Sequence, residues 1–220
     1  MKKVPVTTKM PSLDHLTAAD YERVYEPSDD TFLLIDALAA EHETLTARQP
    51  TICVEIGCGS GAVITHLASL LPDAAMIAGD INRDALKVTA STAVANARLR
   101  VVTMQADLLT AFRPGSIDVL VFNPPYVPTP DEELAEAERT ADISASWAGG
   151  ERGRRVLDRL LPQLGAALAP RGIFYLLGVA ENDPKEIADM LRDQHGFSSR
   201  LIAERRAQNE RLFVMAFERV

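Results

Sequence analysis

The sequence has few of the residues on which several classes of protein depend. Among its 220 residues are two cysteines, Cys53 and Cys58, which lie in one short segment. Such usage excludes a disulfide framework, and a chain of this length can bury a full core without disulfide or metal support. The four histidines are scattered, and no spacing of His, Cys and acidic residues matches a metal site. We therefore expect no bound metal.

The sequence also lacks long apolar runs and a basic excess. No apolar run approaches the roughly 18 residues that a membrane-spanning helix needs, and residues 4–7 do not resemble the apolar segment of a secretory signal. With 23 basic against 31 acidic side chains, the formal net charge of −8 disfavours binding to a phosphate backbone. We expect a cytoplasmic protein, a nuclear pool being compatible with the same features, with neither membrane nor nucleic acid as its partner.

The remaining composition is that of one globular domain preceded by a short arm. Residues 1–23 contain Pro5, Pro11 and scattered polar residues, and they predict a flexible N-terminal arm, whereas residues 24–220 predict a single domain. At its start, Ser28 occupies the position of a helix N-cap, with Asp29 and Asp30 in the first turn. Acidic residues there complement the helix dipole and favour a helix of about three turns.

From residue 50 onward, short apolar runs alternate with stretches of helical periodicity. The expected strands are 51–56, 75–79, 101–105, 117–122, 173–179, 197–204 and 211–217; the expected helices are 62–71, 83–97, 154–168 and 184–194. Alternation of this kind predicts a mostly parallel sheet with helices on both faces. The last two strands have no helix between them and must be antiparallel. We predict an α/β fold with a seven-stranded sheet that ends in an antiparallel hairpin.

Ligands of such sheets bind at the carboxyl ends of the strands, and the loop after the first expected strand is rich in glycine. Gly57, Gly59 and Gly61 permit a tight turn to which a ligand can approach closely, although a purely structural turn has the same composition. Ala62 takes the place of the third glycine of a dinucleotide site. The carboxylate of Glu55 would repel a pyrophosphate and attract an amino group or a sulfonium.

The next two loops each offer a carboxylate. Asp80 ends the second strand about 20 residues after the glycine turn, where it could accept hydrogen bonds from both ribose hydroxyls. Asp80 or Asn82 could instead cap the following helix. After the third strand, Asp107 could accept the exocyclic amine of an adenine while Leu108 packs against the ring.

The loop after the fourth strand carries the strongest signal, the run Asn123-Pro124-Pro125-Tyr126. Two prolines remove two backbone donors and stiffen the turn. The side chain of Asn123 and a backbone carbonyl, that of Pro124, could together accept both hydrogens of a planar NH₂ group, and Tyr126 offers a flat face on which this group could stack. The pattern predicts transfer of a group to a carboxamide, adenine or cytosine nitrogen. A rigid turn with an Asn cap is the alternative.

These motifs together resemble the class I S-adenosylmethionine-dependent methyltransferases with a Rossmann-like sheet, and more narrowly the HemK-type enzymes of the eukaryotic and archaeal branch. The similarity rests on five motifs: VYEPSDDTFLL at 24–34, EIGCGSG at 55–61, DIN at 80–82, FNPPY at 122–126 and WAGGERGR at 147–154. It covers almost the whole chain from residue 25 on. The first and last motifs are much more specific than the glycine loop.

The resemblance implies a cofactor, a substrate and a role for individual residues. Residues implied to line the S-adenosyl-L-methionine site are Thr31, Glu55, Gly57, Gly59, Asp80, Asp107, Leu108 and Asn123. Asn123, Pro124 and Tyr126 would hold the amide of a glutamine, which in this family belongs to the Gly-Gly-Gln loop of a class 1 translation release factor. Lysine methylation of proteins and adenine methylation of DNA have also been attributed to this branch, so a protein lysine and an adenine amine of DNA or RNA remain alternatives. A non-catalytic nucleoside-binding subunit is a third.

The resemblance also implies a small zinc-binding activator subunit. The family's strand order would leave the strand at residues 100–105 at an edge of the sheet. This segment and Leu99 before it are largely apolar and contain no proline, so the edge invites pairing with another chain. We expect a heterodimer formed at this strand.

Overall fold

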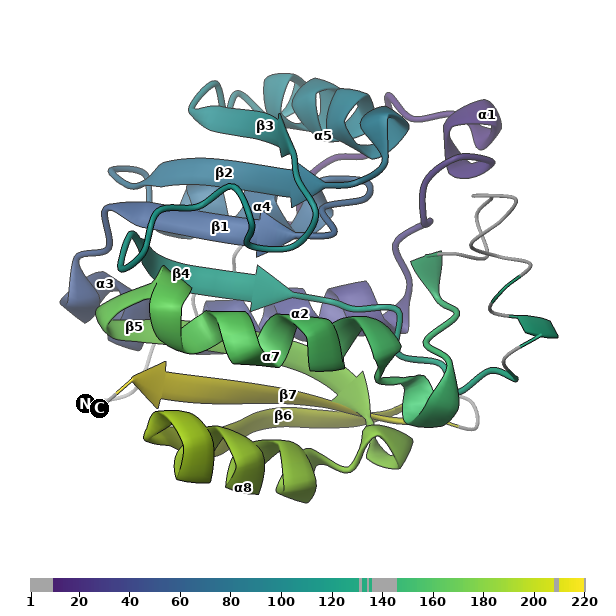
Figure 1. The fold of residues 1–220 in the computed structure, drawn as a ribbon. Coiled ribbons are helices and arrows are strands. Elements are labelled where there is room, and N and C mark those ends of the chain that lie inside the picture. The colour runs from purple at the N-terminus through teal and green to yellow at the C-terminus, as the bar shows by residue number, and fades with distance from the viewer. Residues whose placement is uncertain (1–9, 131, 134, 136–145, 208–209, 220) are drawn as a thin grey trace.

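A sheet of seven strands in the order β3-β2-β1-β4-β5-β7-β6 forms the centre of the computed structural model (Figure 1). The structure describes residues 10–130, 132, 133, 135, 146–207 and 210–219. The strands are β1 (Ile52–Ile56), β2 (Ala75–Asp80), β3 (Val101–Gln105), β4 (Ile117–Phe122), β5 (Leu168–Val179), β6 (Phe197–Ala207) and β7 (Glu210–Arg219). The first five are parallel, and β7 runs antiparallel to both β5 and β6. This confirms the expected fold.

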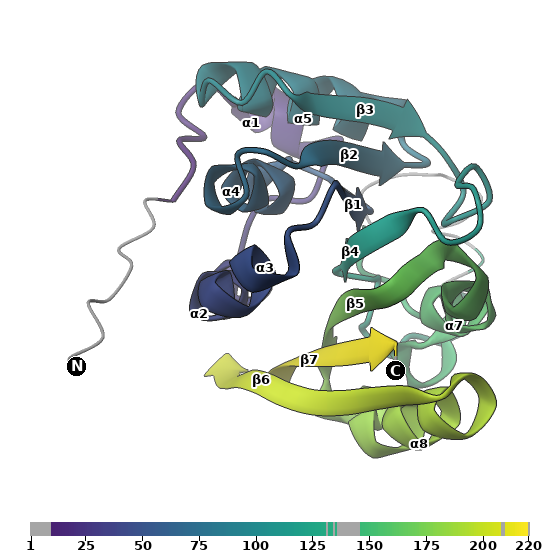
Figure 2. The same ribbon diagram turned by 90° about the vertical axis from the view of Figure 1, so that its left-hand side faces the viewer.

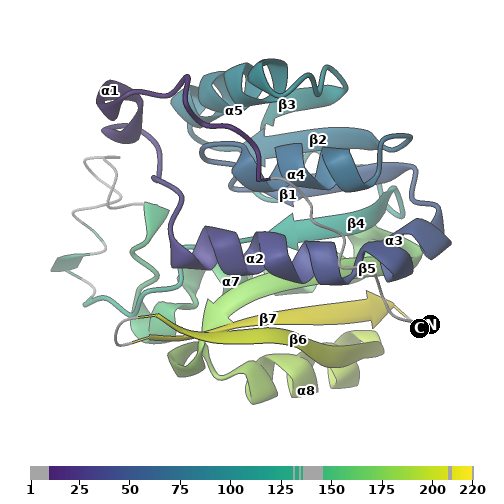
Figure 3. The ribbon, with the colours of Figure 1, turned by 180° about the vertical axis from the view of Figure 1, so that it is seen from behind.

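Helices cover both faces of the sheet. They are α1 (Ala18–Tyr21), α2 (Asp29–Ala40), α3 (His42–Arg48), α4 (Ala62–Leu70), α5 (Arg83–Ala95), α7 (Arg155–Ala167) and α8 (Pro184–His195), with short 3₁₀ turns η2 (Glu151–Gly153) and η3 (Ala180–Asn182). Figure 2 shows α2, α3 and α4 on one face and α7 and α8 on the other; Figure 3 shows the first face from the front. Among the described residues, no helix is long and apolar enough to cross a membrane.

The core is divided by the sheet into two apolar layers. Successive side chains of a strand point to opposite faces, so Val119 and Val121 of β4 pack under α2 and α4, whereas Leu120 and Phe122 pack under α7 and α8. Because both faces of β1, β4 and β5 are covered, these strands are nearly continuous apolar runs, as is typical of parallel sheets. This rigid platform positions the loops at the carboxyl ends of the strands.

Several elements differ from the sequence-based expectation: β6 and β7 extend beyond 197–204 and 211–217, and α1 lies in the segment predicted as a flexible arm. β5 begins at Leu168 instead of residue 173, because Leu168 already pairs with Ile117 before an irregularity shifts the register. The residues Pro170, Arg171 and Gly172, which favour a turn, therefore lie within a strand. Helix α3 lacks a strong start signal: its N-cap position is Glu41, whose side chain makes no capping hydrogen bond.

The described part of the expected N-terminal arm lies against α5. The backbone N–H of Ser12 donates to Oδ1 of Asn96 at 2.8 Å, and Nδ2 of Asn96 donates to the carbonyl of Ser12 at 2.8 Å. Val24 is buried with Ala85 and Val88 of α5. Residues 10–23 thus follow the domain surface, and residues 1–9 lie outside the described part. The division into an arm and one domain stays a prediction.

Candidate active site

A cavity of about 700 Å³ lies where the carboxyl ends of β1, β2, β3 and β4 meet the start of α2. Its volume is in the range of sites for drug-sized ligands. All ten residues proposed from the sequence line it: Thr31, Glu55, Gly57, Gly59, Asp80, Asp107, Leu108, Asn123, Pro124 and Tyr126. The structure therefore brings together in one cavity residues that span almost a hundred positions of the chain.

The glycine turn joins β1 to α4, and its glycines serve two different needs. Gly61 has a φ of +77°, and a Cβ there would lie 2.7 Å from Cα of Thr89, so this position allows α5 to approach the turn. At Gly59, with φ of +48°, a Cβ would meet nothing within 4 Å. Gly59 instead leaves the backbone open toward the cavity, as a closely approaching ligand requires.

Glu55 at the end of β1 is a buried carboxylate beside this turn. Its Oε2 accepts the backbone N–H of Ile64 in the first turn of α4 at 2.8 Å. Burial raises the pKa of Glu55 well above its usual value; the hydrogen bond from Ile64 opposes this shift, and the charge of Asp80 adds to it. A cationic group of a ligand would favour the ionised form, which agrees with the sequence-based expectation of an amino group or a sulfonium.

Asp80 at the end of β2 links the glycine turn to the start of α5. One oxygen accepts the N–H of Asn82 at 2.8 Å and the other accepts the N–H of Gly59 at 3.2 Å. Burial raises the pKa of Asp80, and these backbone hydrogen bonds lower it in part. Asn82, not Asp80, caps α5, because its side chain accepts the N–H of Asp84 at 2.9 Å. The helix-cap alternative for Asp80 is thereby removed, and Asp80 lines the cavity.

The corner after β4 holds an unsatisfied acceptor. Nδ2 of Asn123 donates to Oδ2 of Asp30 at 2.9 Å, whereas the buried Oδ1 of Asn123 has no hydrogen-bond partner among the described residues. A buried polar atom without a partner costs stability and calls for an explanation. Because Asn123 lines the cavity, a ligand that donates a hydrogen bond would supply the missing partner.

Asp30 belongs to this corner, although the sequence reasoning assigned it to the helix dipole. Its carboxylate is 3% exposed and accepts the N–H of Thr31 at 2.7 Å as well as the amide of Asn123. The hydroxyl of Tyr25 lies 3.3 Å from its Oδ1. The signal was present in the specific motif at 24–34, but nothing in the sequence indicated that the start of α2 faces the loop after β4.

Tyr126 is more deeply buried than a stacking platform needs to be. It is 8% exposed and belongs to the core under α2 and α4. Burial raises the pKa of its hydroxyl far above the usual value, and the neighbouring charge of Asp30 adds to this. Tyr126 thus contributes to the wall of the acceptor corner, and its role as a stacking face stays a prediction.

The segment at 147–154 supports the same corner from outside. The N–H of Val127 donates to the carbonyl of Trp147 at 3.0 Å, and the N–H of Gly149 donates to the carbonyl of Val127 at 2.8 Å. Any side chain at Gly153 would overlap the carbonyl oxygen of Tyr126, which also accepts Nδ2 of Asn182 at 2.9 Å. The glycines of this motif are therefore needed for close backbone packing. Residues 131–138, five of which are acidic and which the sequence predicts to form a solvated face, lie mostly outside the described residues.

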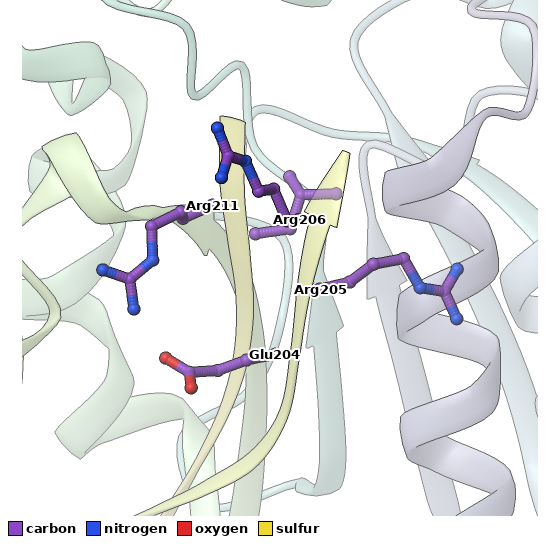
Figure 4. Close-up of a pocket in the computed structure, with 5 residues that line it drawn as sticks. Glu204, Arg205, Arg206 and Arg211 are labelled. Carbon is purple, nitrogen blue, oxygen red and sulfur yellow. The ribbon is translucent and has the colours of Figure 1, made fainter. Parts of the chain in front are cut away.

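A second, smaller hollow of about 400 Å³ lies at the β6–β7 hairpin, and none of the predicted residues lines it. Figure 4 shows its charged side chains, with Arg205 on the side of α2 and Glu204 and Arg211 on the other side of the hairpin. Nη2 of Arg205 lies 2.6 Å from Oδ2 of Asp36, so this arginine is paired. In the part of the chain that the structure describes, no group of three or more His, Cys, Asp or Glu side chains could hold a metal ion.

Comparison with known proteins shows the family. The family model described as the methyltransferase small domain matches residues 30–143. The chain is 41% identical over 213 residues to the methyltransferase HEMK2 of Mus musculus. The aligned region covers 95% of this chain and 96% of that protein. The chain belongs to the HemK-type class I methyltransferases. It is therefore an S-adenosylmethionine-dependent enzyme, as its motifs imply.

Two further HemK-type relatives align along most of their length. The chain is 34% identical to the eRF1 methyltransferase catalytic subunit mtq2 of Schizosaccharomyces pombe, with 100% of this chain and 97% of that protein covered. A solved structure, the E. cuniculi Mtq2-Trm112 complex responsible for methylation of the translation termination factor eRF1, superimposes with a TM-score of 0.66 and 31% identity. It covers 90% of this chain and 99% of the matched one.

Proposed function

We propose that this methyltransferase modifies the side-chain amide nitrogen of the glutamine in the Gly-Gly-Gln loop of a class 1 translation release factor. One observation carries the proposal: a planar amide acceptor, Oδ1 of Asn123, is buried, lines the cavity and lacks a hydrogen-bond donor among the described residues. The relatives named for eRF1 methylation support the choice of substrate.

The residues of the cavity fit S-adenosylmethionine. Asp80 would accept the ribose hydroxyls, Asp107 and Leu108 would contact the adenine, and Glu55 with Thr31 would lie near the methionine moiety. The open backbone at Gly59 and the buried carboxylate of Glu55 suit a nucleoside that carries a positive charge. The bound cofactor supplies an electrophilic methyl group, whose transfer to the amide nitrogen leaves S-adenosylhomocysteine and releases one amide proton.

Asn123 would orient and activate the substrate amide. An amide nitrogen is a poor nucleophile because its lone pair is delocalised. Oδ1 of Asn123 and the carbonyl of Pro124 would each accept one N–H of the substrate amide. These two hydrogen bonds would increase the electron density on the amide nitrogen and fix the plane of the amide. Enclosure of the amide beside the methyl donor then supplies proximity and orientation, the larger part of the acceleration.

Asp30 would act through Asn123. Its Oδ2 accepts Nδ2 of Asn123 and so determines which end of the side-chain amide faces the cavity. The hydrogen bond to the carboxyl group of Asp30 would also polarise the amide of Asn123 and make Oδ1 a stronger acceptor. The other oxygen, Oδ1, already receives the N–H of Thr31. Asp30 is therefore assigned a positioning role.

The edge of the sheet at β3 would hold the activator, which we propose to be a small zinc-binding subunit. β3 is the outermost strand, and Val102 at its middle is 60% exposed. Val94 of α5 and Leu99 are exposed beside it. An apolar, unguarded edge of this kind is suited to strand pairing with a second chain. Substitution of Val102 by Asp should weaken binding of the activator without affecting the catalytic corner, as measured by pull-down and calorimetry.

The substrate is tested directly by mapping the modified residue. The enzyme, alone and with a candidate Trm112-type activator, is incubated with isotope-labelled S-adenosylmethionine and a class 1 release factor, and the product is digested and sequenced by mass spectrometry. The expected result is one methyl group on the glutamine of the Gly-Gly-Gln loop, lost when that glutamine is replaced and when Asn123→Ala enzyme is used. Asn96→Ala, outside the cavity, serves as the control. Label on lysine or on adenine of added DNA, but not on glutamine, would refute the proposal.

A further inference from the structure

The loop that follows β3 is held by two side chains of α7. Nη2 of Arg159 lies 2.5 Å from Oδ2 of Asp107. One helical turn later, Oε1 of Gln163 accepts the N–H of Leu109 at 3.2 Å, while Nε2 of Gln163 donates to the carbonyl of Arg159 at 2.8 Å. Residues three to four apart share one face of a helix, so Arg159 and Gln163 together form a clamp on residues 107–109.

The clamped loop has a backbone that needs such support. Leu108 has a φ of +52°, a conformation that is unfavourable for a residue with a side chain and persists where the surroundings enforce it. Leu108 is nevertheless 5% exposed and packs in the core under α7. The clamp and this burial therefore fix where the carboxylate of Asp107 stands at the cavity wall.

The clamp leaves one oxygen of Asp107 for a ligand. Its Oδ2 is engaged by Arg159, and Oδ1 makes no hydrogen bond with any described residue. Asp107 and Arg159 both line the cavity. The oxygens of a carboxylate that is paired with an arginine act as hydrogen-bond acceptors. Such an acceptor favours the exocyclic amine of adenine and repels the carbonyl oxygen that hypoxanthine carries at the same ring position.

We propose that Arg159 is a positioning residue that sets the selectivity of this cavity for adenine by orienting Asp107. The inference rests on the proposed placement of the adenosyl group beside Asp107 and Leu108. Arg159 would not determine the affinity for the sulfonium end of the cofactor. The glycine turn leads into α4, whose Ile64 donates its N–H to Glu55, and α4 covers the face of the sheet opposite to α7 (Figure 2). Loss of Arg159 should therefore change the discrimination between bases more than it changes catalysis.

If the ion pair between Arg159 and Asp107 served only to stabilise the fold, its removal would lower the thermal unfolding temperature. The side chains of Arg159 and Asp107 are 55% and 46% exposed, and exposed ion pairs contribute little to stability. Arg159→Met should therefore leave the thermal unfolding temperature almost unchanged. A matched control is Arg192→Met, which removes an exposed arginine paired with Asp189 at 2.7 Å on α8, outside the cavity.

The test is calorimetric titration of the enzyme with S-adenosylhomocysteine and with S-inosylhomocysteine, which differ at the base. The wild type should prefer the adenosyl compound. Arg159→Met should weaken its binding roughly 10-fold, the range for a hydrogen bond to a charged group, and leave the inosyl compound within about 2-fold. Arg159→Lys, which retains the charge without the planar fork, should keep part of the preference. Asp107→Asn should lose the preference, and adding Arg159→Met to it should have little further effect.

Three outcomes would overturn the inference. An unchanged preference in Arg159→Met would show that Asp107 is oriented without the arginine. An equal loss of affinity for both compounds would point to a general effect on the cavity. Failure of the wild-type enzyme to bind either compound would instead contradict the placement of the cofactor, and with it the proposed function.

Discussion

The two ends of the cavity are built differently. At the acceptor corner, Asp30 and Tyr126 are buried and the half-buried Asn123 is hydrogen-bonded to Asp30. The 147–154 segment packs against this corner from outside. At the adenine end, Asp107 is half exposed and is held by a solvent-exposed arginine. In the proposed function, the acceptor corner fixes a neutral, weakly nucleophilic amide, whereas the other end admits and releases the nucleoside of the cofactor in every turnover. The more buried and more extensively hydrogen-bonded contacts thus lie at the corner where the proposed function requires orientation of the substrate.

The largest effect is expected from Asn123→Ala. Loss of the buried acceptor should lower kcat by on the order of 10²-fold or more, as for removal of other oriented polar groups that act in a transition state. The dissociation constant for S-adenosylmethionine should change far less, because the side chain of Asn123 is proposed to act on the substrate. Steady-state kinetics together with calorimetry separate the two, and an equal loss of both would contradict the role assigned to Asn123.

Asp30→Asn tests whether the acceptor corner depends on the orientation of Asn123. With the carboxylate gone, Asn123 can rotate its amide, and kcat should fall by roughly 10-fold to 10²-fold. The cofactor dissociation constant should again be nearly constant. The neighbouring Asp29→Asn provides the control, since Asp29 does not line the cavity. Wild-type turnover in Asp30→Asn would show that the packing around Asn123 fixes its orientation without the carboxylate.

Asp80→Ala should affect the cofactor end of the cavity instead of the acceptor corner. It removes the proposed ribose acceptor and the hydrogen bond from Gly59, so S-adenosylhomocysteine should bind about 10-fold more weakly. At saturating cofactor, kcat should change less than 10-fold. Calorimetry and kinetics at two cofactor concentrations provide the measurement, and an unchanged dissociation constant would remove Asp80 from the site.

The smallest effect concerns pH and is expected at the cofactor end. Burial raises the pKa of Glu55, so its carboxylate takes up a proton at a higher pH than an ordinary glutamate does. As the pH falls, the loss of this charge should weaken binding of the cationic S-adenosylmethionine severalfold more than binding of the neutral S-adenosylhomocysteine. Glu55→Gln should make the two pH profiles parallel.

The sign of this effect distinguishes it from acid unfolding. A carboxyl group whose pKa is raised in the folded protein favours the folded state when protonated, so Glu55 does not destabilise the protein as the pH falls. Thermal unfolding measured without ligand over the same pH range should therefore show no loss attributable to Glu55. Parallel profiles of the two ligands in the wild type would mean that Glu55 does not face the sulfonium.

The sequence predicted the cavity better than its internal contacts. Alternating strands and helices placed the four loops at one edge of the sheet, and Asp80, Asp107 and Asn123 follow directly from that rule. Asp30 was missed because α2 precedes the sheet in the chain, and periodicity does not reveal which loop a helix terminus will meet. The start of β5 was misplaced because its pairing with β4 overrides the turn preference of Pro170 and Gly172.

The sequence by itself determined the order of elements, the parallel sheet with its final hairpin, and the chemical groups available at the ends of the strands. These depend on local patterns: apolar periodicity, glycine in the tight turn and two prolines after Asn123. Only the tertiary structure decided that Asp30 directs Asn123 and that Arg159 holds Asp107. Those contacts join residues 93 and 52 positions apart, and their distances are set by how α2 and α7 pack on opposite faces of the sheet.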